Sequence, residues 1–262
     1  MCRLLGISAN KPVDLRFSLF EGRRTLQGLG EENPDGWGLG WYDEDGRPFV
    51  KKEARRPSKS KLFRPTALEA RSRVFVAHVR KATDGRARKK NCHPFCFDRW
   101  LFAHNGSVDR DKLQAHLKAP YAEALEGETD SEVYFRWILQ CIESKGDAKE
   151  GIAAAINVVR LHARTGLNFL LTDGSTLYAY RDCRDGCGGY TLFYLVRASR
   201  DGGPMSVRSR EVEALVESKA LKGERAVLVC SEGLTEEPWT EIPLRHLLVV
   251  GPDLAPSWVE VA

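Results

Sequence analysis

The order of the secondary-structure patterns along the chain constrains the fold more than any other feature of this sequence. Short apolar runs rich in β-prone residues come first, two consecutive helix patterns follow, and further strand patterns complete the chain. The strand patterns lie at residues 4–8, 38–42, 74–79, 100–104, 167–172, 176–180, 190–196, 226–230 and 246–250. Because helices and strands are segregated, this order predicts an α+β protein whose antiparallel sheets are covered by helices.

Both helix patterns begin at recognisable capping residues. A helix is predicted for residues 131–144, where Thr129 and the Glu132 three positions later form a capping-box pattern. A second helix is predicted for residues 148–163, with Asp147 as its cap.

One stretch of the second half has a different character. Residues 181–225 are rich in Gly, Arg, Asp and Ser, and we expect loops there with one short helix at residues 210–219. No shift in composition marks a domain boundary. The sequence therefore predicts a single domain at residues 2–262.

The composition and charge exclude several classes of protein. The chain has 262 residues, 42% of them hydrophobic, and no apolar run reaches the roughly 18 residues of a membrane span. Its 40 basic and 36 acidic residues predict a mixed surface and not the basic face of a nucleic-acid binder. No secretory signal is visible, so we expect a cytoplasmic protein, with no nucleic-acid or membrane partner, whose seven cysteines are reduced.

Cys2 is the first candidate catalytic residue. Removal of Met1, which a small second residue favours sterically, would place this thiol beside a free α-amino group. Such an amine has a reference pKa of about 7.7–8.0 and can act as the base for its own side chain. A structural cysteine near the chain end is the alternative interpretation of Cys2 alone.

A strand pattern at residues 74–79 leads into a candidate substrate-binding residue. Period-two alternation places His78 and Arg80 on the same face of the strand. A guanidinium at the strand end can bind a carboxylate with two parallel hydrogen bonds. A surface salt bridge is the alternative for Arg80 on its own.

Two further motifs follow the next strand. Asn105-Gly106 fits a hairpin turn, but an Asn amide and a neighbouring backbone N–H can also donate to a developing oxyanion. In residues 127–132, helix capping accounts for Thr129 and Glu132 but less well for Asp130, whose carboxylate can bind a substrate ammonium opposite Arg80.

Together these motifs resemble the class II glutamine amidotransferases, a branch of the N-terminal nucleophile hydrolases. Cys2, residues 78–83, residues 104–106 and residues 128–132 follow the family's order and approximate spacing. Residues 1–10, 34–38, 93–95 and 168–174 are similar to the small stand-alone members, the YafJ-like and ergothioneine-pathway amidohydrolase-like proteins. The resemblance spans almost the whole chain, and it implies a four-layer αββα sandwich with two antiparallel sheets.

The resemblance also implies a role for each matched residue and an activity. Cys2 would be the nucleophile and Asn105 and Gly106 the oxyanion hole. The substrate-binding residues would be Arg80 on the α-carboxylate, Asp130 on the α-amino group, and Thr83.

The implied reaction cleaves the side-chain amide of glutamine or of a γ-glutamyl compound through a thioester, with no cofactor and no metal. A separate ammonia-accepting synthetase subunit is a possible partner. A non-catalytic γ-glutamyl-binding regulatory relative is the alternative.

The sequence departs from the family near the nucleophile and in the segment that follows the substrate motif, and its cysteines allow a rival interpretation. Glu32 and Asn33 stand near the position of an Arg-Gly pair whose Arg helps to organise the nucleophile in larger members. Residues around Asp35-Gly36 are candidates to replace the contribution of the Gly, and the residue that positions the Cys2 thiol stays open. Residues 85–90 are unusually basic, which we interpret as favouring an anionic substrate or an acidic partner surface. Two C-x₃-C pairs, Cys92 with Cys96 and Cys183 with Cys187, leave a zinc site as a rival interpretation.

Overall fold

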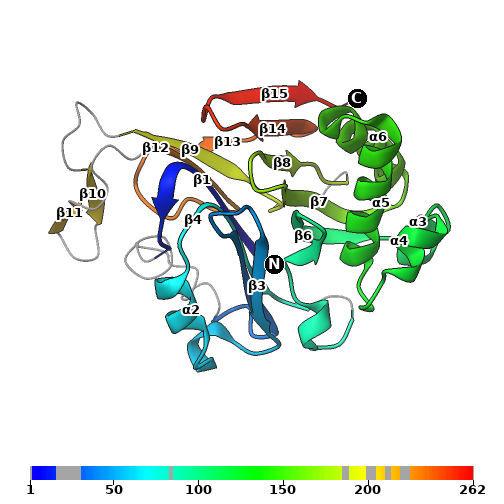
Figure 1. Cartoon of the computed structure of the whole chain (residues 1–262), viewed down its shortest axis with the longest axis horizontal. Coiled ribbons are helices and arrows are strands. Elements are labelled where there is room, and N and C mark those ends of the chain that lie inside the picture. Colours follow the sequence, from blue (N-terminus) through cyan, green and yellow to red (C-terminus); the bar gives the residue numbers. More distant parts are fainter. Residues whose placement is uncertain are drawn as a thin grey trace.

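The protein is built around two stacked antiparallel sheets, shown in a computed structural model (Figure 1). The structure describes residues 2–15, 31–82, 85–184, 189–198, 205–209, 214–218 and 225–261. Within them, the first sheet has the order β13 (Thr240–Glu241), β9 (Phe193–Ala198), β12 (Arg225–Cys230), β1 (Arg3–Val13), β4 (Ser72–Arg80), β2 (Gly36–Tyr42) and β3 (Pro48–Glu53). The second has the order β15 (Pro256–Glu260), β14 (His246–Val250), β8 (Leu177–Arg181), β7 (Ala163–Thr172), β6 (Trp100–Val108) and β5 (Phe95–Phe97).

Helices cover the outer faces of both sheets. The α-helices of the described chain are α2 (Phe63–Glu69), α3 (Arg110–Gln114), α4 (Ala119–Glu123), α5 (Asp130–Lys145) and α6 (Ala148–Leu161). Short 3₁₀ turns occupy η2 (Pro57–Lys59) and η3 (Lys89–Asn91). In Figure 1, α5 and α6 lie side by side against the second sheet, whereas α2 lies with the strands of the first. The expected α+β sandwich is therefore confirmed.

Strand alternation divides the apolar side chains between the layers. In β1, Leu4 belongs to the cluster between the sheets, whereas its neighbour Leu5 belongs to the cluster under α2. In β6, Ala103 faces the other sheet and Phe102 packs beneath α5. Each fully buried Leu or Phe side chain contributes roughly 1.5–3 kcal/mol, and a one-residue slip of register would exchange the side chains of the two layers and disrupt the packing of both.

The same alternation directs polar side chains into the space between the sheets. His78 and Arg80 share a face of β4 with Val76, which lies in the inter-sheet core. Asn105 shares a face of β6 with Ala103. The two strands therefore present polar groups toward each other where the apolar core ends.

Both predicted helix caps are present, although one capping box is incomplete. Thr129 accepts a hydrogen bond from the Glu132 N–H at 3.4 Å, and Asp147 accepts one from the Glu150 N–H at 2.9 Å. The Glu132 carboxylate does not return to Thr129. It accepts the N–H groups of Glu126 and Gly127 instead.

Two helix predictions need correction. The predicted helix at residues 148–163 ends at Leu161, and Ala163 already begins β7. The short helix predicted at residues 210–219 is wrong, because residues 214–218 form β11 (Ala214–Ser218), which pairs with β10 (Met205–Ser209). Backbone pairing between these two five-residue strands overrides the helix propensity of Ala, Leu and Glu.

The cysteines differ from expectation at one position. Cys2, Cys92, Cys96, Cys141 and Cys230 are free thiols, whereas Cys183 is disulfide-bonded, so the expectation of seven reduced cysteines is wrong. Cys187 lies outside the described residues. No group of three or more metal-binding side chains converges anywhere in the described ranges.

None of the helices in the described part of the chain is long and apolar enough to cross a membrane.

Candidate active site

Cys2 lies at the edge of the inter-sheet space, directly before β1. Its Sγ accepts the backbone N–H of Lys81 at 3.1 Å and lies 3.2 Å from the Lys81 carbonyl oxygen. Burial raises the pKa of the Cys2 thiol, and the hydrogen bond from the Lys81 N–H opposes this by lowering it. The end of β4 therefore fixes the thiol and partly stabilises its thiolate form.

Asp35 holds the Lys81 segment in place. Its carboxylate accepts the N–H of Ala82 at 2.8 Å, and its own N–H binds the carbonyl of Arg80 at 3.1 Å. The residues on both sides of Lys81 are therefore anchored. The segment that contacts the Cys2 thiol is thus held by Asp35, a contact that the sequence did not identify.

Asn105 connects β6 to Cys2. Its Nδ2 donates to the carbonyl oxygen of Cys2 at 2.7 Å and to the hydroxyl of Ser231 at 3.1 Å, while its Oδ1 lies 3.2 Å from Nε2 of His78. Burial lowers the pKa of His78 to about 3, so the ring is neutral. Since Oδ1 can only accept, Nε2 of His78 carries the proton and turns the amide donors of Asn105 toward Cys2.

Gly106 has a backbone conformation that other residues rarely adopt. Its φ is +144°, and a Cβ at this position would lie 1.6 Å from the carbonyl oxygen of Gly166 on β7. A side chain here would force β6 and β7 apart. Gly106 lines the same pocket as Cys2.

Arg80 and Asp130 lie on the walls of this pocket. Arg80 is 3% exposed, and its guanidinium donates to the carbonyls of Gly85 and Arg86, both at 3.2 Å. Asp130 is the first residue of α5 and accepts the N–H of Val108 at 2.7 Å. A cation and a carboxylate therefore stand on the walls of one pocket, as a zwitterionic amino acid would require.

The structure brings together most of the predicted site residues. Cys2, Arg80, Gly106 and Asp130 line one pocket, and Asn105 contacts Cys2. Thr83 lies outside the described residues. The pocket is also lined by His93, whose buried ring nitrogens have no hydrogen-bond partner in the described chain. His104 and Ser131 line it as well, and Nδ1 of His104 lies 2.9 Å from Oγ of Ser131.

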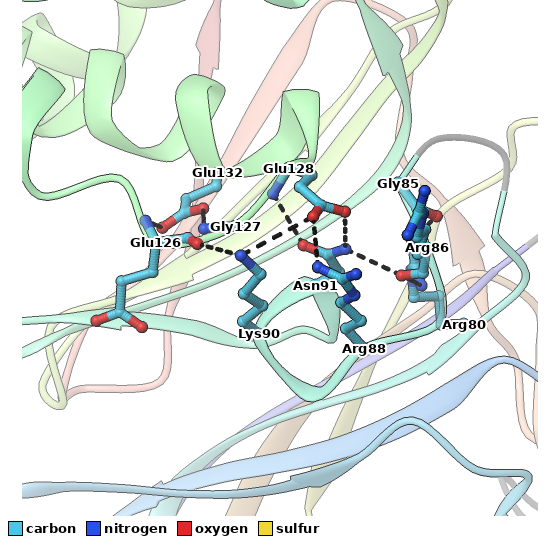
Figure 2. Close-up of polar contacts among 10 residues, drawn as sticks. All are labelled: Arg80, Gly85, Arg86, Arg88, Lys90, Asn91, Glu126, Gly127, Glu128 and Glu132. Carbon is cyan, nitrogen blue, oxygen red and sulfur yellow. Dashed lines mark hydrogen bonds and ion pairs between the residues drawn. The ribbon is translucent and has the colours of Figure 1, made fainter.

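The basic residues that follow β4 form hydrogen bonds and ion pairs with the residues that precede α5 (Figure 2). Within this segment, defined as loop 85–91, Arg88 pairs with Glu128 at 2.8 Å and Lys90 donates to the carbonyl of Glu126 at 2.9 Å. Lys90 also lies 3.9 Å from the Glu128 carboxylate, so two basic side chains of this loop face one acidic side chain of the same chain. This weakens the expectation that they favour an anionic substrate or an acidic partner.

Asn91 joins the same contacts at the centre of Figure 2. Its Nδ2 donates to the Arg86 carbonyl at 2.9 Å and lies 3.3 Å from the Glu128 carboxylate, while its Oδ1 accepts the Glu128 N–H at 2.9 Å. Arg86 is also a partner of Arg80. Asn91 therefore connects the Arg80 side of the pocket to the segment that leads into Asp130.

Comparison with known proteins agrees with this geometry. The family model for class II glutamine amidotransferases matches residues 1–253. The chain is 30% identical to the putative glutamine amidotransferase YafJ of Escherichia coli, over 92% of this chain and 94% of that protein. It is 31% identical to the gamma-glutamyl-hercynylcysteine sulfoxide hydrolase of Mycolicibacterium smegmatis, over 94% of this chain and 90% of that protein.

A solved structure shows the same fold. A glutamine aminotransferase class-II domain protein from Silicibacter pomeroyi superposes with a TM-score of 0.68 at 24% identity, covering 100% of this chain and 99% of that one. By sequence and by fold, the chain therefore belongs to the class II glutamine amidotransferase family and is an enzyme of its amidohydrolase type.

Proposed function

We propose that this protein hydrolyses the γ-amide bond of glutamine or of a γ-glutamyl compound, with Cys2 as the N-terminal nucleophile. The observation that carries the proposal is the convergence of the Cys2 thiol, Gly106, Arg80 and Asp130 on one pocket. Arg80 would bind the α-carboxylate of the glutamyl group and Asp130 its α-ammonium. The name of the Mycolicibacterium relative supports a γ-glutamyl substrate.

The reaction would proceed by acyl transfer. After removal of Met1, the α-amine of Cys2 takes the thiol proton, and the thiolate attacks the δ-carbonyl carbon to form a C–S bond. The C–N bond then breaks, and the amine passes the proton to the leaving nitrogen. Water attacks the thioester, the C–S bond breaks, and glutamate leaves with the thiol restored.

Stabilisation of the oxyanion would fall to Asn105 and Gly106. The amide group of Asn105 already donates hydrogen bonds to the Cys2 carbonyl and to the Ser231 hydroxyl. We expect the hydrogen bond to the Cys2 carbonyl to be replaced by one to the substrate oxyanion. An oxyanion-hole donor of this kind contributes about 3–4 kcal/mol to the transition state.

Family membership supports an amidohydrolase and not the non-catalytic binding alternative. An ammonia-accepting synthetase partner stays a prediction from the resemblance.

The experiment compares Cys2→Ala with Cys96→Ala, a matched change at an exposed free thiol. Intact mass first establishes that Met1 is absent. Glutamate release from glutamine and γ-glutamyl-p-nitroanilide should then fall by a factor on the order of 10³ or more for Cys2→Ala, because the nucleophile is gone. Cys96→Ala should hydrolyse both at the wild-type rate. Equal rates for wild type and Cys2→Ala would refute the proposal.

A further inference from the structure

A second pocket lies on the other flank of Cys2. Besides Cys2 and Asn105, it is lined by side chains that include Arg3, Asn168, Tyr190 and Glu232. It shares Cys2 with the pocket that contains Arg80 and Asp130, and none of its other lining residues.

The order of the strands explains why the two pockets lie on opposite flanks. In the first sheet β1 lies between β4 and β12. Arg80 ends β4 and belongs to the first pocket, whereas Glu232 comes two residues after the end of β12 and belongs to the second. Cys2 immediately precedes β1 and lines both pockets, so this residue stands between them.

This arrangement separates the two halves of a γ-glutamyl substrate. If the glutamyl group occupies the Arg80 and Asp130 pocket, as the proposed function requires, the carbonyl carbon lies at Cys2 and the oxygen faces Asn105. The group attached to the leaving nitrogen must then extend to the opposite flank. The second pocket is the space available there.

The walls of this pocket are polar and fixed in place. The hydroxyl of Thr191 donates to the Ser231 carbonyl at 2.7 Å, and Nδ2 of Asn168 donates to the Thr191 carbonyl at 3.1 Å. The ring of Tyr190 packs so closely on Gly166 that a Cβ there would lie 2.1 Å from it. Gly166 in turn contacts Gly106, so this wall is built against the oxyanion strand.

The pocket also holds a pair of opposite charges. Arg3 and Glu232 form an ion pair, and their side chains are 17% and 18% exposed. Arg3 follows Cys2 directly, and its Nη1 lies 3.4 Å from the Cys2 carbonyl oxygen. The leaving nitrogen of glutamine becomes ammonia, which would use neither the room nor the charges of this pocket.

We infer that the second pocket is the leaving-group subsite and that it takes an α-amino acid, so that the preferred substrates are γ-glutamyl-amino acids. In such a substrate the carboxylate of the leaving residue lies two bonds from the scissile nitrogen. When substrate binds, Arg3 breaks its ion pair with Glu232 and binds that carboxylate instead. Glu232 then binds the ammonium of the released amino acid. This inference rests on the proposed function.

The test isolates the carboxylate by comparing γ-glutamylalanine with γ-glutamylalaninamide, which differ in that one charge. The wild type should prefer γ-glutamylalanine by about tenfold in kcat/KM, because a charge-assisted hydrogen bond is lost in the amide. Arg3→Gln should bring the ratio close to one. The exposed Arg47→Gln is the matched control and should keep the wild-type ratio.

Using a ratio within each variant cancels any general damage to Cys2 from a change at Arg3. Titration calorimetry on the Cys2→Ala protein provides a readout without turnover, and γ-glutamylalanine should again bind about tenfold more tightly than its amide. A wild-type ratio near one, or the same ratio in Arg3→Gln as in the wild type, would overturn the subsite but leave Cys2-dependent hydrolysis intact. Hydrolysis that survives Cys2→Ala would instead overturn the proposed function.

Discussion

The direction in which the Asn105 amide points is determined by its neighbours. Its oxygen faces Nε2 of His78 at 3.2 Å, and its nitrogen faces the Cys2 carbonyl at 2.7 Å. The N–H of His78 and the carbonyl of Cys2 both favour this orientation over the flipped amide, which would present an oxygen to Cys2. His78 is therefore a positioning residue for the oxyanion hole in the proposed mechanism.

Replacing His78 should separate turnover from binding. We expect His78→Phe to lower kcat by roughly 10- to 100-fold, part of the effect of losing an oxyanion donor, while KM changes less than threefold. His78→Gln, whose amide can still donate to Asn105, should recover a measurable part of kcat. Steady-state kinetics on glutamine gives both parameters, with thermal unfolding to show that the variants are folded. A rise in KM at constant kcat would contradict this positioning role.

At the scale of elements, the contact between loop 85–91 and the start of α5 is stabilised more by the neutral side chain of Asn91 than by ion pairs. The Arg88–Glu128 pair is exposed by 46% and 38%, and such pairs contribute only about 0.2–1 kcal/mol. Asn91 is fully buried and makes hydrogen bonds to both Arg86 and Glu128. Loss of a buried partner leaves polar groups unsatisfied at a cost of about 1–3 kcal/mol.

Asn91→Ala should therefore disturb the pocket more than Arg88→Gln does. Because the Arg86 carbonyl would lose one of its two side-chain donors, we expect the Arg80 side of the pocket to shift and KM for γ-glutamyl substrates to rise about tenfold, with kcat less affected. Kinetics on glutamine checks this, and Lys89→Ala, at an exposed position of the same loop, is the control. A KM as low as that of Lys89→Ala would argue against the connection through Asn91.

The sequence predicts well the strands that are buried on both faces and the helix whose apolar pattern repeats over several turns. Strands β1, β4, β6 and β7 and helix α5 were all expected near their observed positions. No sequence pattern predicts β3 or β15, which lie at sheet edges and stay partly exposed. Helices α3 and α4 have five residues each, too few for a helical period to show.

The candidate site was predictable only where one short motif carries the chemistry. Arg80, Asn105 and Asp130 each stand in such a motif. Ser231 does not, because its contact with Asn105 bridges 126 positions and depends on β12 pairing with β1. Asn91 could not be predicted either, because its contact with Glu128 joins residues 37 positions apart.

At the scale of the whole molecule, three buried histidines lie where the layers meet around the pocket. The rings of His78 and His93 are 4.3 Å apart, and His93 and His104 both line the pocket. Burial lowers the pKa of His78 to about 3 and that of His104 to about 4, and it lowers the pKa of His93 well below 6.5. All three rings are therefore neutral in the folded protein near neutral pH.

These lowered pKa values make the fold sensitive to acid. In the unfolded chain each ring titrates near 6.5, so below that pH the unfolded chain binds more protons than the folded one. The stabilising contribution is complete above about pH 6.5 and is lost as the pH falls toward the folded-state values. The free energy of unfolding should therefore fall between pH 7.5 and pH 5.5, because each of the three rings takes up its proton only when the chain unfolds.

His93 is the residue at which this acid sensitivity can be isolated, because its ring nitrogens have no hydrogen-bond partner in the described chain. His93→Phe removes the titrating group without leaving a donor or acceptor unpaired, so its loss of stability between pH 7.5 and 5.5 should be smaller than that of the wild type by on the order of 1 kcal/mol. Urea unfolding at the two pH values measures the difference, and carboxylate titration cancels in the comparison. An equal loss in His93→Phe would mean that His93 takes up its proton without unfolding the protein.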